Sequence, residues 1–438
     1  MSNNNRGEFS SSLGFILAAA GAAIGLGNIW GFPSQAAQNG GAAFVLVYLA
    51  LSFLIAYPAL MAELIIGRYA QSNAVGAFQK IPGGKKFVWV GYAGLISTSL
   101  ILSFYAIVAG WMMAFGVEPL LRVMGLNEAA NWVISQSISS NILFTILFYL
   151  ISIGVVVGGV SRGIERWSSR LMPALLVMLV ILIVYVLTLD GAMKGLKVYL
   201  VPDFSKLTDP NLIINALGQS FFSLSVGVGA MLVYGSYVSK KENISRLGIL
   251  VTLADLGIAF LAGFLIIPAM YAAEAHGAEI FDANGHLLAD GDIVFKVLPT
   301  LFQTMGVWGV PVAVIFFVLM TIAALTSAMS MLENSVSYAV DSGKMPRKKA
   351  TWAIGLGILL ISLLIIFNFD LLFNFVVTLV TVYSLPILAI FFCIFIGWVM
   401  NRNEVLNEIR KGHPEVEKSF FFKFWPIFVK IVTPLLIL

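Results

Sequence analysis

Charge is scarce in this sequence: only 11% of its 438 residues are charged, while 59% are hydrophobic. Because soluble domains carry about 25% charged residues, this composition does not indicate a soluble enzyme. Cysteine is nearly absent, and with Cys393 alone no intrachain disulfide can form. Histidine is rare too, and His276, His286 and His413 fall in expected loops without paired metal-ligand spacing. An intramembrane enzyme, which would need a nucleophile and a base, is therefore disfavoured.

Long uncharged runs take the place of the missing charge. Several exceed the roughly 20 residues that cross a bilayer as a helix. The 13% aromatic content, the 40 glycines and the lack of alternating ten-residue segments favour a helix bundle over an outer-membrane barrel. We predict an all-α polytopic membrane protein with eleven transmembrane helices. Their expected limits are 12–37, 41–69, 87–121, 141–160, 167–188, 212–239, 243–272, 308–340, 350–368, 371–400 and 420–438.

Basic residues are distributed unevenly between the expected loops. With the N-terminus inside, the inner segments hold twenty Lys and Arg residues and the outer loops hold five. The positive-inside rule then places the N-terminus in the cytoplasm and, because the number of spans is odd, the C-terminus outside the cell or in the periplasm. We therefore expect a multi-pass protein of the inner (plasma) membrane, with the lipid bilayer as a partner. Since the basic residues lie in loops, the net charge of +4 does not indicate nucleic-acid binding.

The expected spans divide the chain into two halves. We predict a cytoplasmic N-terminal segment, 1–11, followed by a first five-helix repeat, 12–188, and an extracellular loop, 189–211. A second five-helix repeat, 212–400, includes the acidic extracellular loop 274–306. Residues 401–438 form a cytoplasmic loop and the eleventh helix.

Two of the expected spans contain interruptions typical of broken helices. The first span has four glycines and a proline between Gly21 and Pro33, and the sixth has two serines and two glycines between Phe221 and Gly229. Irregular backbone persists at membrane depth only where it lines a protein-enclosed or watery cavity. One interruption in each half predicts a 5+5 inverted repeat with broken helices 1 and 6, plus one further helix. The alternative is that the small residues only permit close helix packing.

An unwound helix offers ligands for both signs of charge. The amides of a half-helix that begins near Leu26 suit a carboxylate, and the carbonyls that end the preceding half-helix suit a small cation. Oxygen side chains would complete such a cation site. Candidates on other spans are Asp255 and the pair Thr326–Ser327, although membrane hydroxyls usually bond to their own helix.

Glu63, Asp255 and Glu333 are carboxylates inside the expected spans. Asp255 costs roughly 2.5 to 3.5 kcal/mol at the centre of a membrane helix unless it is paired, so we interpret it as functional. Glu63, near the cytoplasmic end of its span, has either a structural role at the helix end or a functional one. Glu333 is either a proton carrier or a buried hydrogen-bonding partner. The pattern leaves both alternatives open.

Several motifs together resemble the neurotransmitter:sodium symporters. They are Gly25-Leu26-Gly27-Asn28-Ile29-Trp30 with Phe32-Pro33, the turn Asn39-Gly40-Gly41, Phe222-Ser223-Leu224-Ser225 and Leu325-Thr326-Ser327, in the family's order and spacing. The resemblance covers nearly the whole chain and is strongest to the family's short bacterial amino-acid transporters with eleven spans, of which a tyrosine transporter is one candidate. Broken helices at the midplane are already known in this family, so they are not independent support for it.

The resemblance implies two bound sodium ions, no organic cofactor and an amino-acid substrate. The first sodium site would be formed by the Ala23 carbonyl, Asn28, Ser223 and Asp255, and the second by Gly21, Ile24, Ala323, Thr326 and Ser327. The substrate would bind among Ala23, Leu26, Gly27, Ile101, Tyr105, Phe222, Ser223, Ser225, Val228, Ser327 and Met331. Its carboxylate would meet the amides of Leu26 and Gly27 and the Tyr105 hydroxyl. Phe222 and Tyr105 would close over it.

The resemblance also implies a cytoplasmic gate. It would consist of Arg6, Asp341, Ser236 and Tyr237. Gly163 and Pro173 match a family element of the fifth span that allows this helix to unwind, so that water reaches the second sodium.

Three departures from the family pattern qualify the resemblance. Gly25 stands where amine transporters carry an aspartate, which favours a ligand with its own carboxylate. Asp255 supplies a fixed negative charge beside the first sodium site and predicts chloride-independent transport. Gly31 replaces the arginine of the outer gate, and neither Asp370 nor Asn374 aligns securely with that arginine's partner.

The sequence thus predicts a sodium-coupled secondary active symporter, not an enzyme. It would import a neutral amino acid, with aromatic side chains slightly favoured over aliphatic ones, by alternating access. The alternative is a proton-coupled amino-acid transporter of similar fold, with Asp255 or Glu333 as the proton carrier. A passive channel or a receptor remains a further candidate. The sequence gives no oligomeric state.

Overall fold

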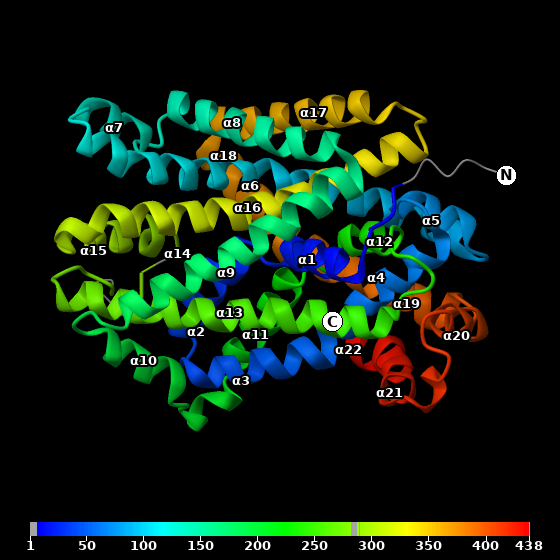
Figure 1. The fold of residues 1–438 in the computed structure, drawn as a ribbon. Coiled ribbons are helices and arrows are strands. Elements are labelled where there is room, and N and C mark those ends of the chain that lie inside the picture. The colour runs from blue at the N-terminus through cyan, green and yellow to red at the C-terminus, as the bar shows by residue number, and fades with distance from the viewer. Residues whose placement is uncertain (1–6, 282–286, 289, 438) are drawn as a thin grey trace.

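The computed structural model of this chain describes residues 7–281, 287–288 and 290–437. Its elements are helices joined by short connections, apart from an isolated β-bridge between Phe281 and Leu287. Most of the long helices run in a common direction, and α9 crosses several of them obliquely (Figure 1). The chain is therefore an all-helical polytopic protein, as the sequence predicts.

Eight helices of the described part are long and apolar enough to cross a membrane. They are Ala42–Ala70 (α3, η2 and α4), Gly84–Val123 (η3 and α6), Ile138–Val157 (α8), Val160–Val186 (η4 and α9), Ile244–Ala275 (α13), Gly306–Asp341 (η7 and α16), Arg347–Phe367 (α17) and Phe369–Val399 (α18, η8, α19 and η9). A bent pair, α1 (Ser12–Ala23) with η1 (Gly27–Gly31) and α2 (Phe32–Gln38), makes a ninth if it is counted as one span.

The other two expected spans are divided into shorter pieces. The sixth consists of α11 (Pro210–Ser223) and α12 (Ala230–Gly235), and the eleventh of α21 (Phe420–Ile427), η11 (Phe428–Val432) and α22 (Thr433–Ile437). Neither is among the helices long enough to span by length and composition. The total of eleven spans and the inverted repeat therefore remain predictions.

Short helices occupy several connections between the spans. They are α5 (Ala74–Lys80), α7 (Asn127–Val133), α10 (Ala192–Leu200), η5 (Phe204–Thr208), α20 (Arg402–Arg410) and η10 (Val416–Lys418). Small polar residues begin several helices by capping their free amides. Ser11 Oγ accepts from the Gly14 amide at the start of α1, and Asn243 Oδ1 accepts from the Arg246 amide at the start of α13.

Within the expected loop 274–306, residues 290–304 are helical. They form α14 (Asp290–Asp292), η6 (Ile293–Val297) and α15 (Leu298–Thr304). Val294, Val297 and Leu298 are buried, because the apolar side of this helical segment packs onto the bundle. The acidic composition of the segment concealed this apolar side.

Seven turns of π-helix interrupt or extend the described helices. Six belong to spans or expected spans: η1, η2 (Ser52–Ala56), η4 (Val160–Glu165), η8 (Leu379–Ser384), η9 (Phe395–Val399) and η11; the seventh is η6. A π-turn holds one more residue than an α-turn and is frequent at functional sites. Here η1 borders the first interruption, and η8 directly precedes α19 (Leu385–Ile394).

The middle of the bundle holds the two interrupted segments. The long helices α6 (Val88–Val123) and α16 (Gly309–Asp341) pack along each other, and α1 crosses the centre of the molecule near α16 and α12 (Figure 1). α1 also packs against α13 (Ile244–Ala275) and α9 (Arg166–Val186). Both interruptions are thus enclosed by protein, where irregular backbone can find partners.

Candidate functional site

The first interruption separates α1 from η1. Ile24 is extended, with φ −70° and ψ 100°, and the two parts meet at a 60° bend. The amides that follow bond to side chains: Gly25 donates to Asn28 Oδ1 over 3.2 Å, and Leu26 donates to the Tyr105 hydroxyl over 3.2 Å. The predicted break is therefore present, and its amides face polar groups instead of a helical ladder.

The second interruption covers the six residues between Ser223 and Ala230. Ser225, Gly227 and Gly229 have positive φ angles of 52°, 103° and 78°. A Cβ atom on Gly227 would lie 2.3 Å from the Leu385 carbonyl oxygen, so only glycine fits there. The glycines of this stretch thus allow both the left-handed turn and a close approach to α19.

Three side chains stabilise the second interruption. Glu63 accepts from the amides of Gly227 and Leu232 over 2.6 and 3.3 Å. Asn334 donates to the Val228 carbonyl over 3.0 Å and to the Thr98 hydroxyl over 2.8 Å. Of the two roles left open for Glu63, this geometry assigns it as an acceptor for the broken helix, because a carboxylate can take several amide hydrogens at once. Asn334 and Thr98 gave no signal in the sequence.

Asp255 meets the two interruptions at a buried polar cluster. Its Oδ1 accepts from Asn28 Nδ2 over 2.7 Å, and its Oδ2 accepts from Ser223 Oγ over 2.8 Å. Asn28 Nδ2 also donates to Ser223 Oγ over 2.8 Å, and the Tyr48 hydroxyl donates to the same oxygen over 3.0 Å. All four side chains are buried. Asn28, Ser223 and Asp255, expected as one cation site, thus lie together, and Tyr48 is an addition.

The residues expected at the second cation site also lie together. Ser327 Oγ donates to the carbonyls of Gly21 and Ile24, each over 3.3 Å. Thr326 Oγ1 donates to the Ala323 carbonyl over 3.0 Å, and a Cβ atom on Gly21 would lie 3.1 Å from Thr326 Cβ. Three carbonyls and two hydroxyls are therefore grouped between α1 and α16. Oxygen donors of this kind suit a hard cation such as sodium.

A cavity of about 40 Å3 lies between the interruptions. It is lined by Ala23, Gly25, Leu26, Gly27, Ile101, Tyr105, Phe222, Ser225, Val228, Ala230, Ser327, Ser330, Met331 and Leu385. All the expected substrate-binding residues are among them except Ser223, which belongs to the Asp255 cluster. Ala230, Ser330 and Leu385 were missed, because small and aliphatic residues in a membrane span give no functional signal.

Two glycines of the first interruption allow the opposite walls of the cavity to lie close to its backbone. A Cβ atom on Gly25 would lie 2.7 Å from both the Tyr105 and the Ser327 hydroxyl oxygens. A Cβ atom on Gly27 would lie 2.7 Å from two ring carbons of Phe222. The Phe222 ring therefore lies directly over the backbone of the first interruption, where a residue that closes the cavity is expected.

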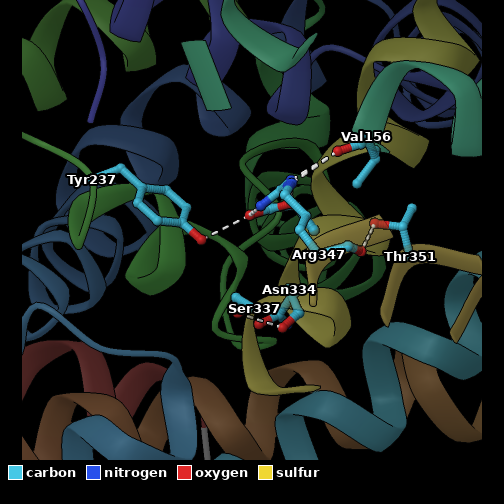
Figure 2. Close-up of polar contacts among 7 residues, drawn as sticks. Val156, Tyr237, Asn334, Ser337, Arg347 and Thr351 are labelled. Carbon is cyan, nitrogen blue, oxygen red and sulfur yellow. Dashed lines mark hydrogen bonds and ion pairs between the residues drawn. The ribbon is translucent and has the colours of Figure 1, made fainter. Parts of the chain in front are cut away.

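An ion pair lies at the end of the bundle that is expected to face the cytoplasm. Tyr237 and Arg347, which are labelled in Figure 2, both contact the Glu333 carboxylate. Tyr237 donates to Glu333 Oε1 over 2.7 Å, and Arg347 Nη2 lies 2.5 Å from Glu333 Oε2. Arg347 also donates to the Val156 carbonyl, over 2.9 and 3.1 Å. Glu333 is thus a buried, charge-paired acceptor, the second of the roles left open for it.

The other expected gate residues have different surroundings. Asp341 Oδ2 accepts from the amide of Asn73 over 3.1 Å, and Ser236 Oγ donates to the Val233 carbonyl over 2.5 Å. Arg6 lies outside the described residues. The expected spans place Arg347 in the loop between residues 340 and 350. Its charge alone does not predict that it pairs with Glu333, which lies 14 residues earlier on α16.

Aromatic rings close the opposite end of the site. Phe295 of η6 packs edge-on to Trp30 and Trp111, with ring centroids 5.7 and 5.6 Å apart. Within the described residues, no hydrogen bond or ion pair joins Gly31 to the exposed Asp370 or Asn374. Gly31 is near Gln219 instead, whose side-chain amide donates to the Gly27 carbonyl over 2.8 Å.

The start of the fifth expected span is irregular. Gly163 lies in the π-turn η4, and a Cβ atom on it would be 2.2 Å from the Val155 carbonyl oxygen. Pro173 lies inside α9, where it removes one helical hydrogen bond. Both are features that weaken the regular ladder of this segment.

The chain is similar to a known family model and to known proteins. Residues 6–143 and 133–438 match the model of the sodium:neurotransmitter symporter family. An uncharacterized sodium-dependent transporter of Bacillus subtilis (strain 168), YhdH, is 34% identical, and the alignment covers 100% of this chain and 97% of the relative. A sodium- and chloride-dependent taurine transporter of Bos taurus is 27% identical over 77% of this chain and 61% of its own length.

A solved structure has the same fold. It is the crystal structure of MhsT in complex with L-phenylalanine, which is 35% identical to this chain. The two superpose with a TM-score of 0.85, over 99% of this chain and 98% of the other.

Proposed function

This chain belongs to the sodium:neurotransmitter symporter family, and from that premise we propose that it imports a neutral amino acid together with sodium and without chloride. We further propose alternating access across the inner membrane, with a cytoplasmic N-terminus. As a family member the protein is a sodium-dependent membrane transporter. The proposal concerns its substrate, its ions and the residues that hold them.

One observation carries the proposal: a buried carboxylate lies where two helix interruptions meet. The Asp255 carboxylate accepts hydrogen bonds from Asn28 and Ser223. Among the described residues, no Lys or Arg forms a salt bridge with it. An ionised carboxylate inside a membrane protein needs an opposite charge. A sodium ion among the oxygens of Asp255, Ser223, Asn28 and Ala23 supplies it. With this fixed negative charge, no chloride is needed to balance two cations.

Asn28 provides a physical link between cation and substrate. Its Nδ2 group faces Asp255 and Ser223, while its Oδ1 accepts from the Gly25 amide. Sodium at this site requires an oxygen ligand, so the amide of Asn28 turns its Oδ1 toward the cation. That rotation releases the Gly25 amide beside the amides of Leu26 and Gly27. A substrate carboxylate then finds free N–H donors and a neighbouring cation together, so each ligand favours the other by linkage.

The cavity walls favour a bulky hydrophobic side chain. Ile101, Val228, Met331 and Leu385 contribute apolar surface, and none of the described residues that line the cavity is charged. Because the Phe222 ring lies directly over Gly27, this ring rotates away when a large substrate binds. That MhsT was solved with L-phenylalanine supports an aromatic or large aliphatic substrate.

The second group of oxygens is proposed as the site of another sodium ion. Gly21, Ile24, Ala323, Thr326 and Ser327 join α1 to α16, so a cation between them holds these helices together. The irregular start of the fifth span, at Gly163, lies on the route by which water would reach this site. Release of the ion into the cytoplasm then frees α1 from α16.

Alternating access needs a barrier on each side of the cavity. On the cytoplasmic side we propose Tyr237, Asp341 and Ser236, together with the Glu333–Arg347 pair; Arg6 completes this set from outside the described residues. On the outer side the rings of Trp30, Trp111 and Phe295 form the barrier instead of an arginine salt bridge.

The driving force follows from the charge that is moved. Each positive charge that crosses the membrane inward gains about 2.3 kcal/mol per 100 mV. Two sodium ions with a zwitterion thus gain roughly 4.6 kcal/mol, which corresponds to accumulation on the order of a thousandfold before any concentration gradient is counted.

Uptake by purified protein in sealed proteoliposomes tests the proposal. We expect concentrative uptake of labelled phenylalanine, tyrosine or leucine when Na+ is outside, and none when choline or K+ replaces it. Replacing chloride by gluconate should leave the rate unchanged. Uptake that persists in choline and collapses with a protonophore would establish proton coupling instead. Uptake that stops at equal concentrations would indicate a channel.

A further inference from the structure

A second hollow lies on the outside of the bundle, away from the transport site. This groove has a volume of about 790 Å3 and is bounded by η2, the start of α4 (Tyr57–Ala70), the first turns of α13 and the C-terminal segment around α21. Figure 1 shows α21 at the same end of the molecule as α20. None of the residues that line the groove also lines the central cavity. Its size lies within the roughly 300 to 1,000 Å3 of typical small-molecule sites.

The groove changes from polar to apolar along its length. On α13, Asn243, Ser245 and Arg246 come first and Ile249 follows one turn later. On the C-terminal segment, His413 and Ser419 precede the phenylalanines that line the rest of the wall. The polar residues of both elements therefore gather at one end. A ligand that fits such a groove has a polar head and a long apolar tail.

Polar atoms at this groove lack partners within the described chain. The Tyr57 hydroxyl, Ser245 Oγ and His413 Nδ1 are buried and form no hydrogen bond. Ser245 is 5% exposed and Tyr57 is 9% exposed. Buried polar groups usually have a partner, and two hydroxyls and an imidazole nitrogen beside one groove suit a ligand that carries acceptor oxygens. The guanidinium of Arg246 is exposed and forms no ion pair with any described residue.

The walls of the groove are held in fixed positions. Trp425 Nε1 donates to the Pro58 carbonyl over 3.1 Å, which attaches α21 to α4. The rings of Tyr57 and Phe421 meet edge-on at 6.1 Å. A Cβ atom on Gly412 would lie 1.8 Å from the Glu242 carbonyl oxygen, so the loop before α21 packs tightly against the loop before α13. The hollow is thus part of the fold and needs no rearrangement to form.

We propose that this groove binds one phospholipid with an anionic headgroup from the cytoplasmic leaflet. Arg246 pairs with the headgroup phosphate, and Ser245 and His413 donate to its oxygens. Tyr57, whose ring lies 3.5 Å from the Cβ position of Gly248, is deeper and donates to an ester carbonyl. An acyl chain follows Ile249 and the aromatic rings toward the exposed side chains of Phe53 and Leu54.

Two features favour a lipid over a soluble anion or a protein. Part of the apolar wall belongs to the spans Ala42–Ala70 and Ile244–Ala275, and Phe53 and Leu54 are 40% and 46% exposed, so the groove opens to the acyl chains of the bilayer. Arg246 belongs to the inner set of basic residues, where the positive-inside rule places anionic lipid within reach. Since the site is separate from the transport cavity, its existence does not depend on which substrate is carried.

Native mass spectrometry of the purified full chain tests the proposal. We expect the wild type to retain one dioleoyl phosphatidylglycerol molecule at least about tenfold more strongly than dioleoyl phosphatidylcholine. Arg246→Gln should remove this preference, whereas Arg166→Gln, an exposed arginine on α9, should keep it. Ile249→Trp should fill the groove and reduce binding of the lipid. Equal retention of both lipids by the wild type, or equal loss in the Arg166 variant, would overturn the proposal.

A second measurement separates the lipid from other ligands and from folding defects. Phosphatidylglycerol should raise the Tm of the wild type in detergent, and inorganic phosphate at millimolar concentration should not. Ser245→Ala should leave the Tm in lipid-free detergent unchanged or slightly higher, because it removes an unpaired hydroxyl, yet reduce the rise caused by phosphatidylglycerol. Stabilisation by inorganic phosphate alone would identify a soluble-anion site. A Ser245 variant that responds fully to the lipid would contradict the assigned contact.

Discussion

A single hydrogen atom at position 25 faces two hydroxyl groups. The Cβ position of Gly25 is 2.7 Å from the oxygens of both Tyr105 and Ser327, so any side chain there must displace one of them. The same residue donates its amide to Asn28. In the proposed binding mode, the absence of a side chain at this residue keeps a second negative charge away from the substrate carboxylate.

Substitution at Gly25 should separate steric from electrostatic effects. We expect Gly25→Ala to weaken amino-acid binding about tenfold or more, because its methyl group would displace the Tyr105 or Ser327 hydroxyl. Gly25→Asp should abolish binding, because it adds a negative charge next to the substrate carboxylate. Isothermal titration with phenylalanine, tyrosine or leucine measures the affinity of both variants. Gly257→Ala, at an open position on α13, is the control. Unchanged affinity in Gly25→Asp would contradict the proposed orientation of the substrate.

The charge of Asp255 should determine the anion requirement. In Asp255→Asn the cluster with Asn28 and Ser223 keeps its shape but loses the charge that compensates sodium. We expect the sodium concentration for half-maximal uptake to rise about tenfold or more, and chloride to restore part of the activity. Uptake in proteoliposomes with chloride or gluconate measures this. Chloride-independent uptake at the wild-type sodium affinity would show that Asp255 does not balance the cation.

At the scale of single elements, the second interruption depends on one side chain. The Glu63 carboxylate accepts from the amides of Gly227 and Leu232 on either side of the break. Two acceptor oxygens on one rigid group fix the distance between these amides. The stability of the broken helix therefore depends on a residue from another span.

Glu63→Gln should destabilise the protein and reduce transport. Its side-chain amide keeps one acceptor oxygen but turns an N–H donor toward a second backbone donor. We expect a loss of about 1 to 3 kcal/mol in the free energy of unfolding, the cost of an unsatisfied buried group. Thermal unfolding in detergent measures it, with Glu128→Gln, an exposed residue of α7, as the control. Equal Tm values for both variants would refute this role for Glu63.

The sequence predicts the elements better than their mutual contacts. The glycines near Gly25 and Gly227 predict both interruptions, because Gly227 and Gly229 have positive φ angles and a Cβ atom on Gly25 or Gly227 would lie too close to its neighbours. The cost of placing a carboxylate in a membrane helix marks Asp255 as functional from its position in an apolar run. Arg347 and Phe295 give no such signal, since their partners lie on other helices. Helical order in 290–304 is likewise hidden by acidic neighbours. Contacts between distant segments depend on helix packing, which periodicity does not encode.

At the scale of the whole molecule, the Glu333–Arg347 pair joins segments that would separate when the protein opens inward in the alternating access proposed above. Glu333 is fully buried and belongs to α16, Arg347 begins α17, and Tyr237 follows α12. Arg347 also donates to the Val156 carbonyl near the end of α8, a contact that Figure 2 shows. One guanidinium therefore connects α16, α17 and α8 at this end of the molecule.

Replacing Arg347 alone should reduce the stability of the protein more than replacing both Arg347 and Glu333. Arg347→Gln leaves the buried Glu333 charge without its partner, for which we expect a loss of about 3 to 5 kcal/mol in stability and a strong decrease in uptake. Adding Glu333→Gln should recover most of the stability, because the uncompensated charge is gone. Thermal unfolding of the two single variants and the double variant measures this coupling. Additive losses would show that the two side chains do not act as a pair.

The seven π-turns have a consequence for how such a chain tolerates changes in length. Because η8 holds one residue more than an α-turn, deleting a residue there would return the helix to regular winding without breaking it. The segments after η8 would keep their orientation, because the π-turn already accommodates the extra residue without turning the helix that follows. Leu385, which follows η8 directly and lines the cavity, would therefore stay in place, whereas removing a residue from a regular α-turn would rotate everything after it by about 100°. Single-residue changes in length at π-turns inside helices, not only in loops, are thus a route by which related proteins can vary without losing the shape of the pocket.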